Sequence, residues 1–349
     1  MKKFISAIII IALTIFIIFG LKTVLGPIFD EITKNQYVSD NGWLKVEGTQ
    51  LKNESNNNFT LKGVSSHGLQ WYSDMLTADN IKELKDTWHI NVFRIAMYTD
   101  SNGYISNKET MKNKLIEVAD IAINLDLYVI IDWHTLTDNN PNIHKEEAKV
   151  FFDEISCLYK DTPNIIYEIC NEPNGNSITW DDEIKPYAEE IIPVIRKNSP
   201  NSIIIVGTPS WCKELKPAAE NRLKFDNILY SCHFYAATHK DDIRQEVSEA
   251  YDKGLPIIVS EWGTTEASGN GYVDKEESKK WIEFLKSKNI SFINWSFSNK
   301  EENSAIVNKD YKPNQKQDSN SENNQDKPAS FNDYLTDSGN LVKSLILSN

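Results

Sequence analysis

Short apolar runs and longer amphipathic segments alternate along most of the chain. Runs such as "VFRIAM", "LYVIID", "SIIIVG", "PIIVSE" and "ISFINW" are rich in β-branched residues and almost uninterrupted. Such runs are typical of strands that are covered on both faces. The pattern predicts eight strands, at residues 59–65, 92–96, 127–132, 165–170, 202–207, 228–234, 257–261 and 290–296.

Amphipathic helices are predicted between these strands. In residues 108–125, Met111, Leu115, Val118 and Ala122 recur at helical spacing. The stretch "VDKEESKKWIEFLKSKNI" begins with acids and ends with lysines, which matches the helix dipole. The predicted helices cover residues 78–88, 108–125, 144–159, 180–198, 241–253 and 274–288, and "DSGNLVKSLIL" adds a last one.

Repeated strand–helix alternation predicts an α/β fold, a (β/α)8 TIM barrel. The alternative is a doubly wound open sheet, which would carry a glycine-rich phosphate turn after its first strand. The segment in that place, "GVSSHGLQW", is not such a turn. A short β-hairpin is expected before the barrel, within "GWLKVEGTQLKNESNNNFTLKGVS", with its turn in the Asn/Ser-rich part.

The first 22 residues form a separate segment. Residues 4–21 are apolar and are flanked by Lys2, Lys3 and Lys22. Eighteen residues make about 27 Å of helix, close to the thickness of a bilayer core. Residues 1–22 are therefore predicted to be a signal peptide or a membrane anchor. Both alternatives export the rest of the chain, which would be secreted or anchored to the outer face of the cell membrane.

The remaining chain divides into a tether and one domain. Residues 23–40 are predicted to be the tether, and residues 41–349 the barrel. Residues 308–330 are polar, rich in Asn, Gln, Ser and Lys, and almost without aliphatic side chains, so they are predicted to be a mobile insert.

Charge and cysteine spacing exclude some functions. The net charge of −13 argues against binding to nucleic acid, which requires a basic surface. The four cysteines form no CxxC pair, so their spacing indicates neither a zinc site nor a redox motif. We expect no cofactor, no metal and a monomer.

Polar side chains stand at the end of almost every predicted strand. In "IIYEICNEPNG", an apolar strand delivers Asn171 and Glu172 at its tip, and "SEWG" delivers Glu261 three strands later. Active sites of such barrels lie at the carboxyl ends of the strands. Two carboxyl groups facing each other across the mouth suit glycoside hydrolysis, in which one protonates the leaving oxygen and the other attacks the anomeric carbon. The polar residues at the strand ends are His67, Arg94, Asp132, Trp133, His134, Asn171, Glu172, His233, Tyr235, Glu261 and Trp295.

These motifs resemble a known family. "NEP" and "SEWG" resemble the corresponding motifs of glycoside hydrolase family 5, and "GVSSHGLQW", "DWH", "HFYA" and "NWSFSNKEENSA" resemble its bacterial endo-β-1,4-glucanases, or cellulases. The resemblance extends from about Trp43 to Leu347. It implies a retaining endo-β-1,4-glucanase that acts on β-glucan polysaccharides or cello-oligosaccharides, with Glu172 as acid/base and Glu261 as nucleophile.

The resemblance also implies supporting roles for other residues. Arg94 and Tyr235 would bond Glu261, Asn171 would bond the sugar 2-hydroxyl, and His134 and His233 would hold the hydrogen-bond network of the mouth. Trp295 would stack on the sugar just before the cleaved bond. His67, Trp71, Trp211 and Lys300 would line the glucan cleft, although Trp71 and Trp211 could instead be packing residues and Lys300 an ordinary loop lysine.

Electrostatics independently predicts unequal carboxyl groups. Arginine stays charged, so Arg94 is expected to lower the pKa of Glu261. The pKa of Glu172 is expected to lie higher. Two alternatives stay open: a β-mannanase or other β-glycanase using the same site, and a non-catalytic glycan-binding protein at the cell surface.

Overall fold

The structure, a computed structural model, describes residues 36–313 and 329–348. The predictions for residues 1–22, and most of those for residues 23–40 and 308–330, lie outside the described residues. Within the described part, no helix is both long and apolar enough to cross a membrane. Residues 1–36 and Tyr37–Asn349 are separate units, and everything below concerns the second.

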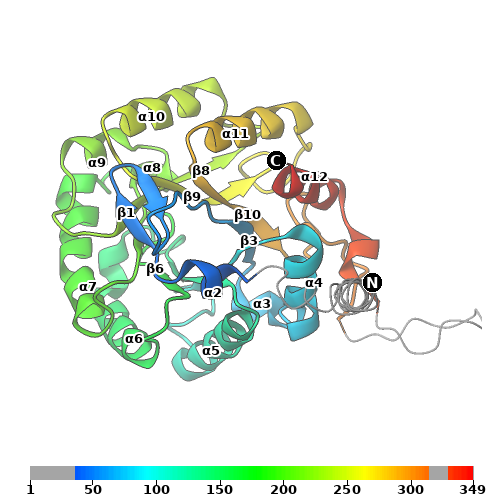
Figure 1. The fold of residues 1–349 in the computed structure, drawn as a ribbon, viewed down its shortest axis with the longest axis horizontal. Coiled ribbons are helices and arrows are strands. Elements are labelled where there is room, and N and C mark those ends of the chain that lie inside the picture. The colour runs from blue at the N-terminus through cyan, green and yellow to red at the C-terminus, as the bar shows by residue number, and fades with distance from the viewer. Residues whose placement is uncertain (1–35, 314–328, 349) are drawn as a thin grey trace, which may run out of the picture. The chain divides into compact units, whose positions relative to one another are not determined.

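Eight parallel strands close into a barrel, with helices around it (Figure 1). The order is β10-β3-β4-β5-β6-β7-β8-β9, so each strand pairs with its neighbour in sequence and the last with the first. This confirms the predicted (β/α)8 fold. The strands are β3 (Lys62–Ser66), β4 (Val92–Tyr98), β5 (Tyr128–His134), β6 (Ile165–Glu168), β7 (Ile204–Val206), β8 (Ile228–Tyr235), β9 (Ile257–Gly263) and β10 (Ser291–Phe297).

The helices begin and end where side chains satisfy their free backbone groups. Thr77 accepts a hydrogen bond from the backbone N–H of Asn80 at the start of α4, and Asp274 does the same for Glu277 in α11. The longer helices are α4 (Ala78–Trp88), α5 (Lys108–Asn124), α6 (Lys145–Leu158), α7 (Lys185–Asn198), α10 (Asp241–Asp252), α11 (Lys275–Ser287) and α12 (Asp337–Leu347). The short ones are α2 (Tyr37–Asn41), α3 (Leu69–Tyr72), α8 (Pro209–Cys212) and α9 (Lys216–Glu220).

Two helical predictions need correction. The single helix expected over residues 180–198 is a π-helical turn, Trp180–Ile184, that continues into α7. The helices α8 and α9 between β7 and β8 were not predicted. Each has at most five residues, too few to show a periodic apolar face.

Strand side chains alternate between two apolar regions. On β4, Phe93 and Ile95 point outward and pack under the helices, whereas Val92 points into the barrel. The same alternation places Ile130 of β5 and Ile166 of β6 inside. The inward positions nearer the carboxyl ends of these strands are charged, so the lower barrel is an apolar core and its mouth is not.

The antiparallel hairpin, β1 (Lys45–Glu47) and β2 (Gln50–Lys52), confirms the short hairpin predicted before the barrel and closes the apolar end. Leu44 and Leu51 pack against the inward residues of the lower barrel. Figure 1 shows the hairpin, in blue, and α2, in darker blue, in front of the barrel. The turn is at Gly48, where a positive φ of 62° favours glycine, and not in the Asn/Ser-rich stretch, which follows β2. The folded unit begins at Tyr37, since α2 is anchored through Ser39, whose hydroxyl donates to Asp126.

Candidate active site

Arg94 is the centre of a buried charge cluster at the barrel mouth. Its side chain projects from β4 and is fully buried. Burial alone would lower the pKa of Arg94, but the carboxylates of Asp132, Glu168 and Glu261 raise it well above its ordinary value. The guanidinium makes four hydrogen bonds and one further ion-pair contact. Nε contacts Glu168 (2.7 Å), Nη1 contacts Ser65 (3.2 Å) and Glu261 (3.3 Å), and Nη2 contacts Asn171 (2.7 Å) and Asp132 (3.0 Å).

Glu261, on β9, receives the two donors that the sequence analysis assigned to it. The Tyr235 hydroxyl donates to Oε1 over 2.8 Å, and Arg94 donates to Oε2 over 3.3 Å. Burial nevertheless raises the pKa of Glu261 to about 7, as does the charge of Glu172, while His233, Arg94 and Tyr235 lower it. Arg94 thus lowers the pKa of Glu261 as expected, but burial and Glu172 outweigh it, so the net shift is upward. Arg94 divides its charge among three carboxylates and cannot offset the burial of each.

Glu172 lies across the mouth, four residues beyond the end of β6. Its backbone N–H donates to the carbonyl of Thr135 over 3.0 Å, which fixes the strand tip. Its Oε1 lies 2.8 Å from Nδ1 of His233. Burial raises the pKa of Glu172 to about 7, while Arg94 and Lys213 lower it.

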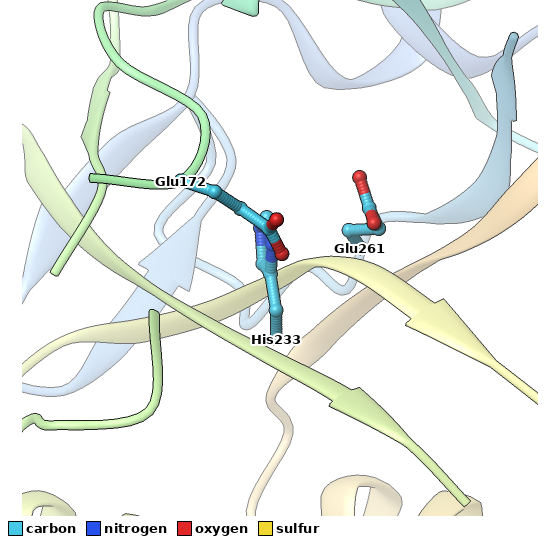
Figure 2. A group of neighbouring side chains, drawn as sticks. All are labelled: Glu172, His233 and Glu261. Atoms are coloured by element: carbon cyan, nitrogen blue, oxygen red, sulfur yellow. The ribbon is translucent and has the colours of Figure 1, made fainter. Parts of the chain in front are cut away.

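The two glutamates and His233 form one compact group, shown in Figure 2. One ring nitrogen of His233 and one carboxylate oxygen of each glutamate all lie within 4.8 Å of one another. Two hydrogen-bond donors point at Glu261, whereas the carboxyl group of Glu172 contacts a histidine. We therefore expect the first negative charge of this coupled pair to reside on Glu261, although burial raises both pKa values.

A second set of hydrogen bonds supports the group from below. His134 contacts Asp132 through Nδ1 (2.6 Å) and the side-chain amide of Asn171 through Nε2 (3.3 Å). His233 contacts the Ser260 hydroxyl through Nε2 (3.0 Å). Both histidines thus belong to the hydrogen-bond network of the mouth. Burial lowers the pKa of His233 to about 4, so its ring is neutral at higher pH.

The carboxyl groups of Glu172 and Glu261 line a cleft of roughly 360 Å³. Trp295 lines this cleft and stacks on His134, with ring centroids 5.3 Å apart and planes 19° apart. Apolar ring faces beside polar groups suit a sugar, which has faces of both kinds. Of the predicted residues, the cleft is lined by His67, His134, Glu172, Trp211, His233, Tyr235, Glu261, Trp295 and Lys300.

Three predicted residues lie elsewhere. Arg94 and Asn171 are buried beneath the cleft and do not line it in this structure. Trp71 is 49% exposed and does not line the cleft, because the short helix α3 turns it toward a neighbouring hollow. Its ring contacts Tyr98 and His67 at centroid distances of 5.0 and 5.8 Å. Both of these residues line the cleft, so Trp71 lies behind the lining and not in it.

Trp211 reaches the cleft through an unusual turn. Ser210, Trp211 and Cys212 all have a φ of 58°, a conformation that costs about 1–2 kcal/mol for a residue with a Cβ. Hydrogen bonds hold the turn, from Trp211 N–H to the Pro173 carbonyl and from Cys212 N–H to the Thr208 carbonyl. The turn leaves Trp211 44% exposed at the cleft.

Several residues of the site were missed by the sequence analysis. Glu168 and Ser260 belong to the buried network, and further lining residues come from the end of β4 and from loops. Glu168 had a detectable signal, since it follows Ile166 at strand spacing and therefore shares its inward face. The additional lining residues are Tyr98, Leu136, Lys213, His239, Ala267, Ser268, Gly269 and Glu302.

Among the described residues, Glu172, His233 and Glu261 have the spacing of a possible metal site. Both ring nitrogens of His233 and both carboxylate oxygens of Glu261 already have hydrogen-bond partners. The guanidinium of Arg94 would also repel a cation. The arrangement therefore favours proton transfer, and the expectation of no metal stays a prediction.

Comparisons with known proteins identify the family of the chain. The family profile "Cellulase (glycosyl hydrolase family 5)" matches residues 52–301. Endoglucanase A of Evansella cellulosilytica is 55% identical over 247 residues, covering 71% of this chain and 50% of that protein. An endoglucanase of Clostridium saccharobutylicum is 48% identical over 306 residues, covering 88% of this chain and 66% of the relative. The chain thus spans about half to two thirds of the length of these relatives.

A solved structure has the same barrel. The catalytic domain of Thermobifida fusca endoglucanase Cel5A, in complex with cellotetraose, superposes with a TM-score of 0.79 at 33% identity. The match covers 89% of this chain and 99% of that one. Together with the profile match, this similarity shows that the chain belongs to glycosyl hydrolase family 5, the cellulase family.

Proposed function

We propose that this protein hydrolyses internal β-1,4-glucosidic bonds of cellulose or related β-glucans, with retention of configuration at the anomeric carbon. The observation that carries the proposal is the spacing of the two glutamates. One carboxylate oxygen of Glu172 lies within 4.8 Å of one carboxylate oxygen of Glu261. Retaining enzymes hold their two carboxyl groups about 5–5.5 Å apart, and inverting enzymes about 6.5–9.5 Å apart. The shorter separation leaves no room for a water molecule between the attacking carboxylate and the sugar.

In the first step, Glu261 attacks the anomeric carbon while Glu172 gives its proton to the leaving glycosidic oxygen. The carboxylate of Glu261 is held in place by Tyr235 and Arg94. A covalent glycosyl–enzyme bond forms as the glycosidic bond breaks.

In the second step, Glu172 is the base. It takes a proton from water, the resulting hydroxide attacks the anomeric carbon, and Glu261 leaves as a carboxylate. Glu172 is protonated again, so the two steps return both residues to their starting states. A pKa raised to about 7 suits a group that must both donate and accept a proton near neutral pH.

The remaining side chains position the sugar. Asn171 is fixed by Arg94, which donates to its Oδ1 over 2.7 Å, and we assign its amide to the 2-hydroxyl. Trp295 and Trp211 offer ring faces for stacking, and Lys300 and His67 offer polar contacts along the cleft. The cellotetraose bound to the Thermobifida fusca relative supports a chain of several glucose units as the substrate.

Export across the cell membrane is also part of the proposal. It rests on the apolar residues 4–21 and their flanking lysines, which serve a secreted and an anchored protein equally well. An external location suits an enzyme whose polymeric substrate cannot enter the cell.

The test compares the full-length wild type with Glu261→Gln on carboxymethyl-cellulose. We expect activity in the wild type and a loss of about 10³-fold or more in the variant, because covalent catalysis fails without its nucleophile. Equal melting temperatures would show that the variant is folded. Freshly formed products should first carry the β-configuration by NMR.

The same assay discriminates the alternatives. A folded wild type that cleaves mannan or xylan but not the glucan would favour another β-glycanase. A folded wild type that binds these polymers without cleaving any of them would favour a glycan-binding protein. Comparable activity in wild type and Glu261→Gln would overturn the assignment of the nucleophile.

A further inference from the structure

A chain of buried hydrogen bonds leads from Glu172 to a third glutamate. Nε2 of His233 lies 3.0 Å from the Ser260 hydroxyl, and the same hydroxyl lies 2.5 Å from Oε1 of Glu168. The Ser231 hydroxyl is a third neighbour of Ser260, at 2.5 Å. These side chains are buried, so the positions of the protons are set by the groups themselves.

The number of hydrogens determines the direction of each bond. The Ser260 hydroxyl has one hydrogen and three neighbours. Glu168 forms an ion pair with Nε of Arg94 over 2.7 Å, and a carboxylate can only accept. Ser260 therefore donates to Glu168, and it must accept from Ser231 and from His233.

This direction fixes the tautomer of His233. If Ser260 accepts from His233, the ring carries its proton on Nε2. A neutral ring with a proton on Nε2 has a bare nitrogen at Nδ1, which is the atom that faces Glu172 at 2.8 Å. A bare nitrogen can only accept, so Glu172 must supply the hydrogen.

We propose that Glu168 is a positioning residue that acts through Ser260 to hold the His233 proton on Nε2, and that the bare Nδ1 thereby keeps Glu172 in its acid form. The proposal rests on the proposed function, in which Glu172 is the acid. It also bears on the second step. Once Glu172 has given up its proton, its carboxylate faces a nitrogen lone pair, an unfavourable contact that is relieved when Glu172 takes a proton from water.

Other charged groups also act on this pair. Burial lowers the pKa of His233 to about 4, which agrees with a neutral ring, and burial raises the pKa of Glu172 to about 7. Because these surrounding groups also shift the titration, the pH profile needs a variant that changes the proton arrangement without changing charge, and Ser260→Ala is that variant. The groups that face Glu172 or His233 are Arg94 on β4, Tyr98 on β4, Asp132 and His134 on β5, Glu168 on β6, Lys213 after β7, Tyr235 on β8 and Glu261 on β9.

Three substitutions separate the possibilities. Ser260→Ala removes the connecting hydroxyl without changing charge. Ser231→Ala is the matched control, since it removes a neighbouring buried hydroxyl that touches neither His233 nor Glu168 in the inferred arrangement. Glu168→Gln should reverse the direction of the bonds. The amide oxygen of the new glutamine must face the Arg94 donor, so its NH2 group faces the Ser260 hydroxyl. Ser260 then accepts from this NH2 group and donates its own hydrogen to Nε2 of His233.

The first measurement is the 15N NMR spectrum of the full-length protein labelled in histidine, with the His233 signals assigned by His233→Asn. In the wild type and in Ser231→Ala at pH 6, we expect a protonated Nε2 and a bare Nδ1. In Glu168→Gln we expect the opposite tautomer. A wild-type ring with its proton on Nδ1, or on both nitrogens, would overturn the proposal, and this result does not depend on activity.

The second measurement is the pH dependence of kcat/KM on a soluble cello-oligosaccharide. In Ser260→Ala, Nδ1 can donate to an ionised Glu172, so the basic limb should move to lower pH by about one unit. The limb of Glu168→Gln should move the same way, but this variant also loses a negative charge that raises the pKa of Glu172, so its tautomer is the deciding measurement. The limb should stay in place in Ser231→Ala. Coincident basic limbs in all four proteins would contradict the proposal, whereas an inactive wild type with the expected tautomer would contradict the proposed function alone. If Ser260→Ala does not fold, Glu168→Gln and the wild-type spectrum still decide.

Discussion

The inward-facing strand residues are apolar at one end of the barrel interior and charged at the other. Near the amino ends of the strands, Val92, Ile130 and Ile166 form an apolar core beneath the hairpin. One inward step further along the strands, Arg94 and Glu168 form an ion pair without access to water. On β6 the change from apolar to charged takes only two residues.

This contrast shows how the barrel separates stability from chemistry. The lower layer gains free energy by removing apolar surface from water, about 25 cal/mol per Å². The upper layer gathers three carboxyl groups around one arginine, an arrangement in which the cost of removing charges from water is met only if every partner is present. Substitutions in the two layers should therefore differ in kind as well as in size.

The largest effect is expected for Arg94→Met. The substitution leaves Asp132, Glu168 and Glu261 buried without their cation, which should cost about 3–5 kcal/mol of unfolding free energy. It also removes a donor from Glu261, so activity should fall by at least about 10²-fold. Urea denaturation and assays on carboxymethyl-cellulose measure the two losses.

Arg94→Lys is the matched control for charge. A lysine keeps the cation but cannot occupy five directions with N–H donors. We expect intermediate stability and an activity still far below that of the wild type. A stable and active Arg94→Met protein would show that the upper layer is not organised around this cation.

A smaller effect, confined to stability, is expected for Ile166→Ala in the lower layer. The lost side chain leaves a cavity in the core and should cost about 3 kcal/mol. Ile166→Val should cost about 1 kcal/mol. Both variants should keep kcat/KM within about twofold of the wild type at a temperature where they are folded. A tenfold loss of activity in Ile166→Val would indicate that the two layers are not independent.

The lower layer was much easier to predict from the sequence than the upper one. Continuous β-branched runs identified all eight strands, and the position of each strand end brought Glu172 and Glu261 to the same face. The short helix α9 and the location of the hairpin turn were missed, because a few residues carry no periodic signal. These errors concern local geometry and leave the topology intact.

The network beneath the site depends on contacts that a sequence does not display. Ser260 and Glu168 are 92 residues apart and meet only because β6 and β9 close into the same barrel. The pKa of Glu261 was expected to be low because one neighbour, Arg94, was considered alone. Its actual direction depends on burial and on the other carboxylates that share the same arginine.

The smallest effect is expected in the pH dependence of stability, which should change in Glu172→Gln at the mouth but not in a variant of the lower layer. Burial raises the pKa of Glu172 from an ordinary value of 4.5 to about 7, so the folded protein holds this proton more tightly than the unfolded chain. The resulting stabilisation is complete below about pH 4.5 and is lost as the pH rises through 7. Glu172→Gln carries no charge at any pH, and its amide can donate to Nδ1 of His233 as the protonated acid does. We therefore expect the variant to gain stability relative to the wild type as the pH rises, by an amount on the order of 1–2 kcal/mol.

Thermal unfolding at pH 4, 5, 6, 7 and 8 measures this difference, with Ile166→Val as the control. Because Ile166→Val involves no titrating group, its melting temperature should stay below that of the wild type by a constant amount. The difference for Glu172→Gln should be near zero at pH 4 and reach a plateau in favour of the variant by pH 8. Parallel curves for the two variants would mean that the carboxyl group of Glu172 titrates normally and that the mouth, like the lower barrel, is indifferent to pH.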